Sequence, residues 1–127
     1  KNKVYMDMFE EIDHKEVKHI SLADKADVVL IAPATANIIG KIANGIADDF
    51  LSTVVMAAAT RKPVYIAPAM NTNMYENPIV QGNMEKLKGL GYRFIEPKES
   101  MLACGVTGKG ALADVDHIVE IIEGSIE

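Results

Sequence analysis

Short apolar runs alternate along this chain with longer segments in which apolar residues recur every three or four positions. The apolar runs cover residues 27–32, 63–67 and 92–95, and proline, glycine or charged residues flank each of them. Runs of this length are typical of strands that are buried on both faces of a parallel sheet. Strands that alternate with helices indicate a parallel sheet with helical connections. The pattern therefore predicts an α/β fold.

The segments between the runs carry signals for helix ends. Asp48 is suited to cap a helix, because its short polar side chain can accept a hydrogen bond from the first turn. Pro78 is suited to the first turn of another helix, and Gly91 to its end. Helices are predicted over residues 35–44, 48–58 and 77–91, and from Asp114 onward.

The connections between these elements are also marked in the sequence. Pro33 is expected to end the first strand, because proline lacks the backbone N–H that a central strand donates. Gly105, Gly108 and Gly110 predict a long, glycine-rich loop before the last helix.

The start of the chain departs from the pattern of a doubly wound domain. Such a domain normally begins with a buried strand and a Gly- or Ser-rich turn that holds phosphate. Residues 5–18 mix Met, Phe and acidic residues and predict a short irregular or helical lead-in instead. We therefore expect a single domain over residues 1–127 that lacks its N-terminal strand and phosphate-binding turn.

Composition narrows the function classes. The 127 residues are 49% hydrophobic, enough for one core, and the net charge of −5 disfavours nucleic-acid and anionic-membrane partners. The single cysteine excludes an internal disulfide and a cysteine-rich metal site, and it fits a reducing cytosol. No apolar run approaches the roughly 18 residues that span a bilayer. We expect a cytoplasmic domain without a metal.

The loop after the first strand reads Pro33-Ala34-Thr35-Ala36-Asn37. Its small residues would let a flat ring approach the backbone, while Thr35 and Asn37 offer hydrogen bonds and the following helix adds positive potential. The alternative is an ordinary strand-to-helix turn in which Thr35 caps the helix.

The loop after the second strand contains Met70-Asn71-Thr72-Asn73-Met74. The amide of Asn71 can donate to a carboxylate without a second buried charge, and Met70 and Met74 can supply adaptable apolar walls. The alternative is that Asn71 or Thr72 caps a helix and that the methionines belong to the core.

Two further side chains are candidates for proton transfer. His19 is a natural proton acceptor at neutral pH, although a lone histidine is more often a surface or capping residue. Cys104 lies in the segment Ala103-Cys104-Gly105, whose glycines, with those that follow, suggest a mobile flap over a substrate. The alternative for Cys104 is a small buried apolar residue.

Four segments, in chain order, resemble motifs of the homo-oligomeric flavin-containing cysteine decarboxylases. They are a His-Ile-x-Leu segment at His19, a Pro-Ala-Ser-Ala-Asn-Thr motif, a Pro-x-Met-Asn-x-x-Met-Trp motif and an Ala-Cys-Gly-x-x-Gly-x-Gly flap. The chain departs from them at Thr35, Ile38 and Tyr75, which stand for Ser, Thr and Trp. The flap resembles that of the phosphopantothenoylcysteine decarboxylases and favours them over the peptidyl-cysteine decarboxylases.

The resemblance implies a flavodoxin-like, doubly wound, three-layer α/β/α fold. It also implies FMN-dependent decarboxylation of 4′-phosphopantothenoylcysteine to 4′-phosphopantetheine in coenzyme A biosynthesis. His19 would act as base, Cys104 as proton donor, and Asn71 would hold the substrate carboxylate. The remaining implied contacts are Met74, Ala103 and Gly105 for the substrate, and Pro33, Ala34, Thr35, Ala36, Asn37 and Met70 for FMN.

Family members also assemble as homotrimers or groups of trimers, and in bacteria a synthetase domain often follows. Without the expected upstream strand and turn, the 127-residue chain alone should hold FMN weakly or not at all. The alternatives are a peptidyl-cysteine decarboxylase and a non-catalytic, phosphatase-regulatory relative. Loss of the histidine, asparagine or cysteine would favour the latter, and His19, Asn71 and Cys104 are all present.

Overall fold

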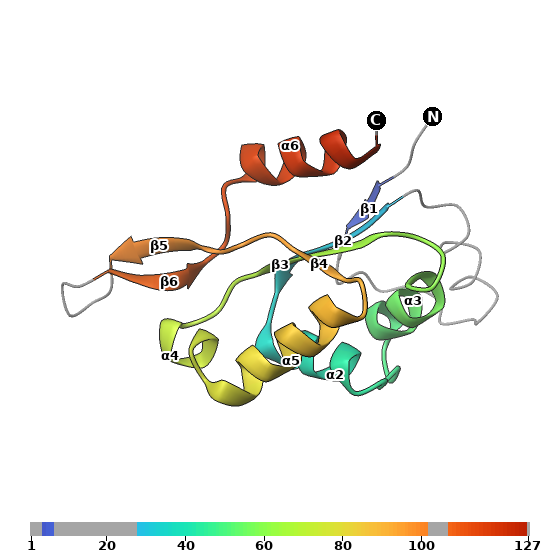
Figure 1. The fold of residues 1–127 in the computed structure, drawn as a ribbon, viewed down its shortest axis with the longest axis horizontal. Coiled ribbons are helices and arrows are strands. Elements are labelled where there is room, and N and C mark those ends of the chain that lie inside the picture. The colour runs from blue at the N-terminus through green and yellow to red at the C-terminus, as the bar shows by residue number, and fades with distance from the viewer. Residues whose placement is uncertain (1–3, 7–27, 102–106, 127) are drawn as a thin grey trace.

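The computed structural model describes residues 4–6, 28–101 and 107–126, and its centre is a parallel sheet. Four strands pair in the order β1-β2-β3-β4, and all three pairings are parallel. A separate antiparallel pair, β5 and β6, lies beyond the sheet (Figure 1). The strands are β1 (Val4–Met6), β2 (Val28–Ala34), β3 (Val64–Pro68), β4 (Arg93–Phe94), β5 (Lys98–Met101) and β6 (Thr107–Ala111).

Helices lie on both faces of the sheet, so the predicted α/β class and its three layers are confirmed. Figure 1 shows α2, α3 and α5 on one face and α6 alone on the other. The short α4 lies near the β5–β6 hairpin. The helices are α2 (Ala36–Ala43), α3 (Phe50–Ala58), α4 (Thr72–Tyr75), α5 (Pro78–Gly89) and α6 (Val115–Ile126). Among the described residues, no helix is long and apolar enough to cross a membrane.

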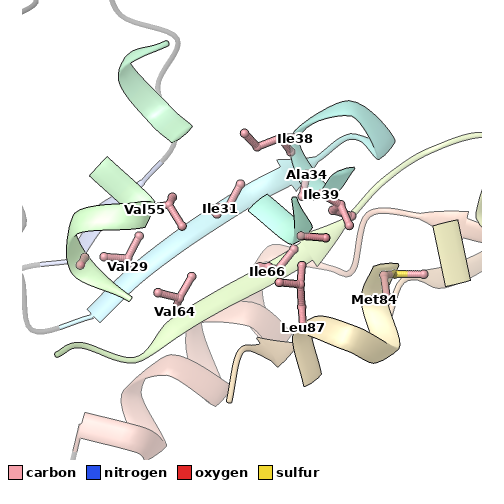
Figure 2. Packing of buried hydrophobic residues seen from close by; sticks show 12 residues of the cluster. Val29, Ile31, Ala34, Ile38, Ile39, Val55, Val64, Ile66, Met84 and Leu87 are labelled. Carbon is pink, nitrogen blue, oxygen red and sulfur yellow. The ribbon is translucent and has the colours of Figure 1, made fainter. Parts of the chain in front are cut away.

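The core consists of two clusters of buried residues, one on each face of the sheet, because successive strand residues point to opposite faces. Ile31 and Ile66 face α2, α3 and α5 and are fully buried there (Figure 2). Their neighbours Leu30 and Tyr65 face the other way and pack with Ile118 of α6. Burying an aliphatic side chain of this size stabilises the fold by about 1.5–3 kcal/mol. The continuous apolar runs are thus explained by burial on both faces, as predicted.

The helix boundaries follow local capping chemistry. Thr35 caps α2 through its Oγ1, which accepts from the Ile38 N–H at 3.2 Å. For α3 the prediction of Asp48 was wrong by one residue, because Asp49 is the cap. Its carboxylate accepts from the Ser52 N–H at 2.8 Å, and the Ser52 hydroxyl accepts from the Asp49 N–H. This capping box satisfies two backbone donors at once.

The prediction that Pro33 ends the first strand was also wrong. The β2 strand continues to Ala34, and the Ala32–Pro33 peptide bond is cis. Ile31 pairs with Ile66 and Ala34 with Pro68, so β2 uses one more residue than β3 over this stretch. A bulge of this kind absorbs a proline without ending the pairing.

The predicted glycine-rich loop is in part a hairpin. Residues 98–101 and 107–111 pair in antiparallel fashion, with a register shift between Lys98 and Glu99. Residues 102–106 lie outside the described residues. Glycine-rich sequence weakened the strand signal here, because β propensity reflects side-chain packing that glycine cannot provide.

The expected lead-in was wrong at its beginning. Val4–Met6 is a strand, β1, and its residues pair with Val28, Val29 and Leu30 of β2. The rest of the predicted lead-in, residues 7–18, lies outside the described residues. The apolar pattern failed because three residues at an edge are too few to show a period.

Candidate functional site

Two of the predicted ligand loops lie side by side at the carboxyl edge of the sheet. They follow β2 and β3, which are parallel neighbours and end together where Ala34 pairs with Pro68. The Ala69 N–H donates to the Ala34 carbonyl at 3.0 Å and ties the two loops to each other. Ligands of open α/β sheets bind at this edge.

The β5–β6 hairpin contacts the loop after β3, at the same edge of the sheet, through Gly110 of β6. The Met70 N–H donates to the Gly110 carbonyl at 2.8 Å. Gly110 has a φ of +144°, and a Cβ there would lie 2.4 Å from the Met70 carbonyl oxygen. Only glycine permits this close contact of two backbones. The described end of the cysteine-containing segment therefore docks on the loop that carries Asn71.

The chemistry of the β2–α2 loop suits a flat, hydrogen-bonding ring. Two of its residues have small side chains, Ala34, which is buried, and Ala36, which is half-buried, while Thr35 and Asn37 are exposed. Thr35 uses a lone pair to cap α2, which leaves its hydroxyl hydrogen as a donor. Asn37 is exposed in the first turn, where free backbone N–H groups and the helix dipole favour electron-rich atoms. The loop can both cap the helix and hold a cofactor.

Asn71 caps a helix, as one interpretation of the sequence expected, and its carboxylate-binding role stays a prediction. Its Oδ1 accepts from the Asn73 N–H at 2.7 Å and caps α4. Because the cap needs the oxygen, the orientation of the amide follows, and the NH₂ group remains a double donor. Among the described residues, no hydrogen bond from this NH₂ group is found. It is a suitable donor pair for a carboxylate.

The two methionines differ in burial. Met70 is half-buried and packs against the core cluster between the sheet, α2, α3 and α5. Met74 has 48% of its surface exposed. The alternative that both are core residues therefore fails for Met74, which is free to contact a ligand.

Sequence reasoning missed Glu96, which follows β4 at the same edge of the sheet. Its Oε1 accepts from Lys109 Nζ at 3.0 Å and from the Tyr75 hydroxyl at 3.3 Å. The hydrogen bond from Lys109 lowers the pKa of Glu96 below its ordinary value, against the opposing effect of burial. Its place after the third predicted strand was the available signal, since polar residues there are ligand candidates.

A shallow hollow at the start of α6 is a poorer candidate. It is lined by Asp114, Asp116 and Glu120, with His117 and Val115. Three carboxylates repel an anionic substrate. Within the described ranges, no cluster of three His, Cys, Asp or Glu residues is arranged to hold a metal ion.

The comparison with protein families settles what kind of protein this is. A family model described as Flavoprotein matches residues 1–127. The chain belongs to the flavoprotein family. Over 97% of its length it is 51% identical to the coenzyme A biosynthesis bifunctional protein CoaBC of Bacillus subtilis, of which it covers 30%. Over the same share it is 50% identical to a probable phosphopantothenoylcysteine decarboxylase of Streptococcus mutans, of which it covers 69%.

Solved structures of similar chains agree with the family. A cysteine-to-serine mutant of PPC decarboxylase, complexed with pantothenoylaminoethenethiol, has a TM-score of 0.78 and 40% identity. The FMN binding protein AtHal3 has a TM-score of 0.77 and 42% identity. Both comparisons cover 84% of this chain, but only 58% and 57% of the solved chains. They confirm the flavodoxin-like fold, while this flavoprotein chain spans little more than half of either structure.

Some of the site residues predicted from sequence lie among the described residues. The structure brings together the loop over residues 33–37, Met70 and Asn71, and it places Met74 one helical turn further on. His19 and the flap residues Ala103, Cys104 and Gly105 lie outside the described residues. Their functions stay predictions.

Proposed function

We propose that this chain is the decarboxylase domain of an FMN-dependent enzyme. Its substrate is 4′-phosphopantothenoylcysteine and its product 4′-phosphopantetheine, a step of coenzyme A biosynthesis. The observation that carries the proposal is the convergence of three loops at one edge of the sheet. One suits a flavin, and one presents the NH₂ of Asn71, for which no partner is found among the described residues. The hairpin docks on this second loop through Gly110. The relative from Streptococcus mutans, 50% identical, is named for this activity.

FMN fits the β2–α2 loop. Pro33, Ala34 and Ala36 leave room for the ring, and Thr35 and Asn37 provide donors; Met70 adds an apolar wall. Bound there, the flavin would supply reversible hydride transfer, which allows the substrate thiol to be oxidised to a thioaldehyde for the loss of CO₂ and reduced again afterwards. AtHal3, a structural relative, is described as an FMN binding protein.

Asn71 orients the substrate carboxylate without neutralising it. A lysine or arginine would stabilise the carboxylate in the ground state more than in the transition state, where its charge is leaving. A neutral amide donates two hydrogen bonds at lower cost to the reaction. The helix cap holds the Asn71 side chain in place, because its oxygen is already bound to the Asn73 N–H.

His19 and Cys104 complete the proposed chemistry. His19 accepts the thiol proton during oxidation, since a neutral imidazole is an effective base near pH 7. Cys104 gives a proton to the enethiolate that remains after CO₂ loss. A thiol is more acidic than an alcohol by several pKa units, which suits it to this transfer.

Replacement of Cys104 by Ser tests the assignment. Oxidation and CO₂ loss should continue, while the enethiolate goes unprotonated, so an oxidised aminoenethiol should accumulate. The structural relative complexed with pantothenoylaminoethenethiol is a cysteine-to-serine mutant. The assay is mass spectrometry of the products, in the protein expressed with any sequence that flanks this chain naturally.

The matched control is His19→Asn, which should bind FMN and release no CO₂. Normal 4′-phosphopantetheine from the Cys104→Ser variant would reduce Cys104 to a packing residue. Conversion of a peptide ending in cysteine, with no conversion of phosphopantothenoylcysteine, would instead support the peptidyl-cysteine decarboxylase alternative.

The assembly and cellular setting are also proposals. We infer a cytoplasmic homotrimer, or a group of trimers, and a synthetase domain following this one in a longer protein. The bifunctional relative from Bacillus subtilis supports the fusion, because this chain covers 30% of it. Light scattering during gel filtration should give three chains per particle or a multiple of three; a monomer that is active would contradict this.

A further inference from the structure

A single carboxylate, that of Glu96, connects three elements around the candidate site. Its Oε1 accepts from the Tyr75 hydroxyl of α4 at 3.3 Å and from Lys109 Nζ of β6 at 3.0 Å. Lys88 Nζ of α5 lies 3.9 Å from its Oε2. The groups are in suitable protonation states: burial raises the pKa of Tyr75, so its hydroxyl stays a donor.

The α4 helix needs external support. It has four residues and none of them is buried, and isolated helices of one turn are unstable. At its first end, the Met70 N–H binds Gly110 of β6. At its other end, the Tyr75 hydroxyl donates to the Glu96 carboxylate, which also accepts a hydrogen bond from Lys109, the residue before Gly110 in β6. Asn71 lies between these two attachments.

Tyr75 provides an attachment through its phenol hydroxyl. The motif has tryptophan at this position, and an indole N–H is a donor in a different place from a phenol hydroxyl. In this chain the Tyr75 ring packs against the core cluster while its hydroxyl reaches the exposed Glu96. The side chain therefore transmits the position of Glu96 to α4.

We propose that Glu96 is a positioning residue that fixes α4, and with it the NH₂ group of Asn71, against β6. The inference rests on the proposed function, because Asn71 is there the group that holds the substrate carboxylate. Glu96 acts through Tyr75 and Lys109. Exposed ion pairs contribute little to stability, so loss of Glu96 should change the kinetic constants more than the stability of the fold. A small displacement of a group that orients the substrate lowers the rate or the affinity.

The test compares Glu96→Gln with a control variant at a different surface ion pair, that of Lys98 on β5. Lys98 of β5 pairs with Asp114 at 2.6 Å and does not reach α4 in the described structure. We expect Glu96→Gln to raise the KM for 4′-phosphopantothenoylcysteine about tenfold, with a smaller change in kcat. Lys98→Gln should leave both constants within about twofold. FMN content and Tm should match the wild-type protein in both variants.

Two further variants separate positioning from general loss of structure. Tyr75→Phe removes only the hydroxyl and should reproduce the rise in KM. In an Asn71→Ala background, Glu96→Gln should add little, because residues that act through one another are not additive. The charge swap Glu96→Lys with Lys109→Glu should recover part of the affinity.

The outcomes distinguish this inference from the proposed function. If the FMN-loaded wild-type protein does not decarboxylate the substrate, the proposed function fails and the inference with it. If the wild-type protein is active and Glu96→Gln and Tyr75→Phe both match Lys98→Gln in KM, the inference alone is overturned. A full effect of Glu96→Gln in the Asn71→Ala background also overturns it.

Discussion

Single side chains in this protein serve the fold and leave groups available for a ligand. Thr35 and Asn71 each use a lone pair to cap a helix, and each keeps a hydrogen-bond donor. The alternatives posed from the sequence, helix cap or ligand contact, are therefore compatible. A cap at the carboxyl edge of a parallel sheet is well placed for both.

The cap of α3 gives a test at the same scale. Asp49→Ala should lower the free energy of unfolding by about 1 kcal/mol, because it removes the acceptor for the Ser52 N–H. Asp48→Ala should change it by less than about 0.5 kcal/mol, since Asp48 is exposed and the interaction found for it among the described residues is a surface ion pair with Lys41. Urea denaturation of both variants measures the difference. Equal losses would show that the cap is shared.

The ionisation of Asp49 predicts a pH dependence. Burial opposes the charge, but hydrogen bonds from Lys41 and Ser52 lower the pKa of Asp49 from 3.8 to about 2. A lowered pKa adds stability above the unfolded value of 3.8, and this is lost as the pH falls towards 2. Because the carboxyl is half exposed, we expect on the order of 1 kcal/mol or less. Asp49→Asn should lack this pH-dependent contribution. The wild-type protein should therefore have a higher free energy of unfolding than Asp49→Asn at pH 5, and the difference should be smaller at pH 2.5.

Local sequence explains the cap only in part. Both Asp48 and Asp49 satisfy the preference for a short acidic cap, and the sequence analysis chose the wrong one. The deciding contact is the reciprocal hydrogen bonding with Ser52, because Lys41 of α2 pairs with both aspartates. The preference for a short acidic cap does not include this partner, whereas the residue three positions on does separate the two: it is Ser52 for Asp49 and the apolar Leu51 for Asp48.

At the scale of elements, the sequence predicts those strands and helices whose formation depends on the apolar pattern of a single segment. The runs that became β2 and β3 and the helices between them are as expected, because their residues are buried on defined faces. The β5–β6 hairpin and the bulge at Pro33 were missed. Both are settled by pairing with another segment, so they need the tertiary structure.

Replacement of glycine by alanine should have opposite effects on stability at two positions, Gly110 and Gly82. Gly110→Ala should destabilise the hairpin dock, because the new Cβ would meet the Met70 carbonyl at 2.4 Å in a backbone conformation that disfavours alanine. We expect a loss of about 1–3 kcal/mol. Gly82→Ala, in α5 with open space around it, should stabilise by about 0.5–1 kcal/mol.

Thermal unfolding of both glycine variants, followed by circular dichroism, measures these effects. The two variants control for each other, because both add one methyl group and differ only in its position. A Gly110→Ala variant as stable as the wild-type protein would show that β6 does not dock on the Met70 loop as described.

At the scale of the whole molecule, the candidate site is an edge where loops distant in sequence meet. The sequence predicted each of the loops after β2 and β3 as a ligand loop, and the parallel pairing of the two strands brings the loops together. The position of Glu96 after a predicted strand was a signal, but the partners of Gly110 and Glu96 could not be predicted, because both residues act through contacts between elements. His19 and Cys104 were predicted from resemblance alone and stay predictions.

The most direct test of the account is a single assay of the protein that carries this chain. The FMN-loaded protein is incubated with 4′-phosphopantothenoylcysteine, and CO₂ and the thiol product are followed by mass spectrometry. We predict release of CO₂ with formation of 4′-phosphopantetheine, dependent on FMN and markedly slowed, with a raised KM, in Asn71→Ala. A protein that binds FMN stoichiometrically and leaves the substrate unchanged would contradict the account.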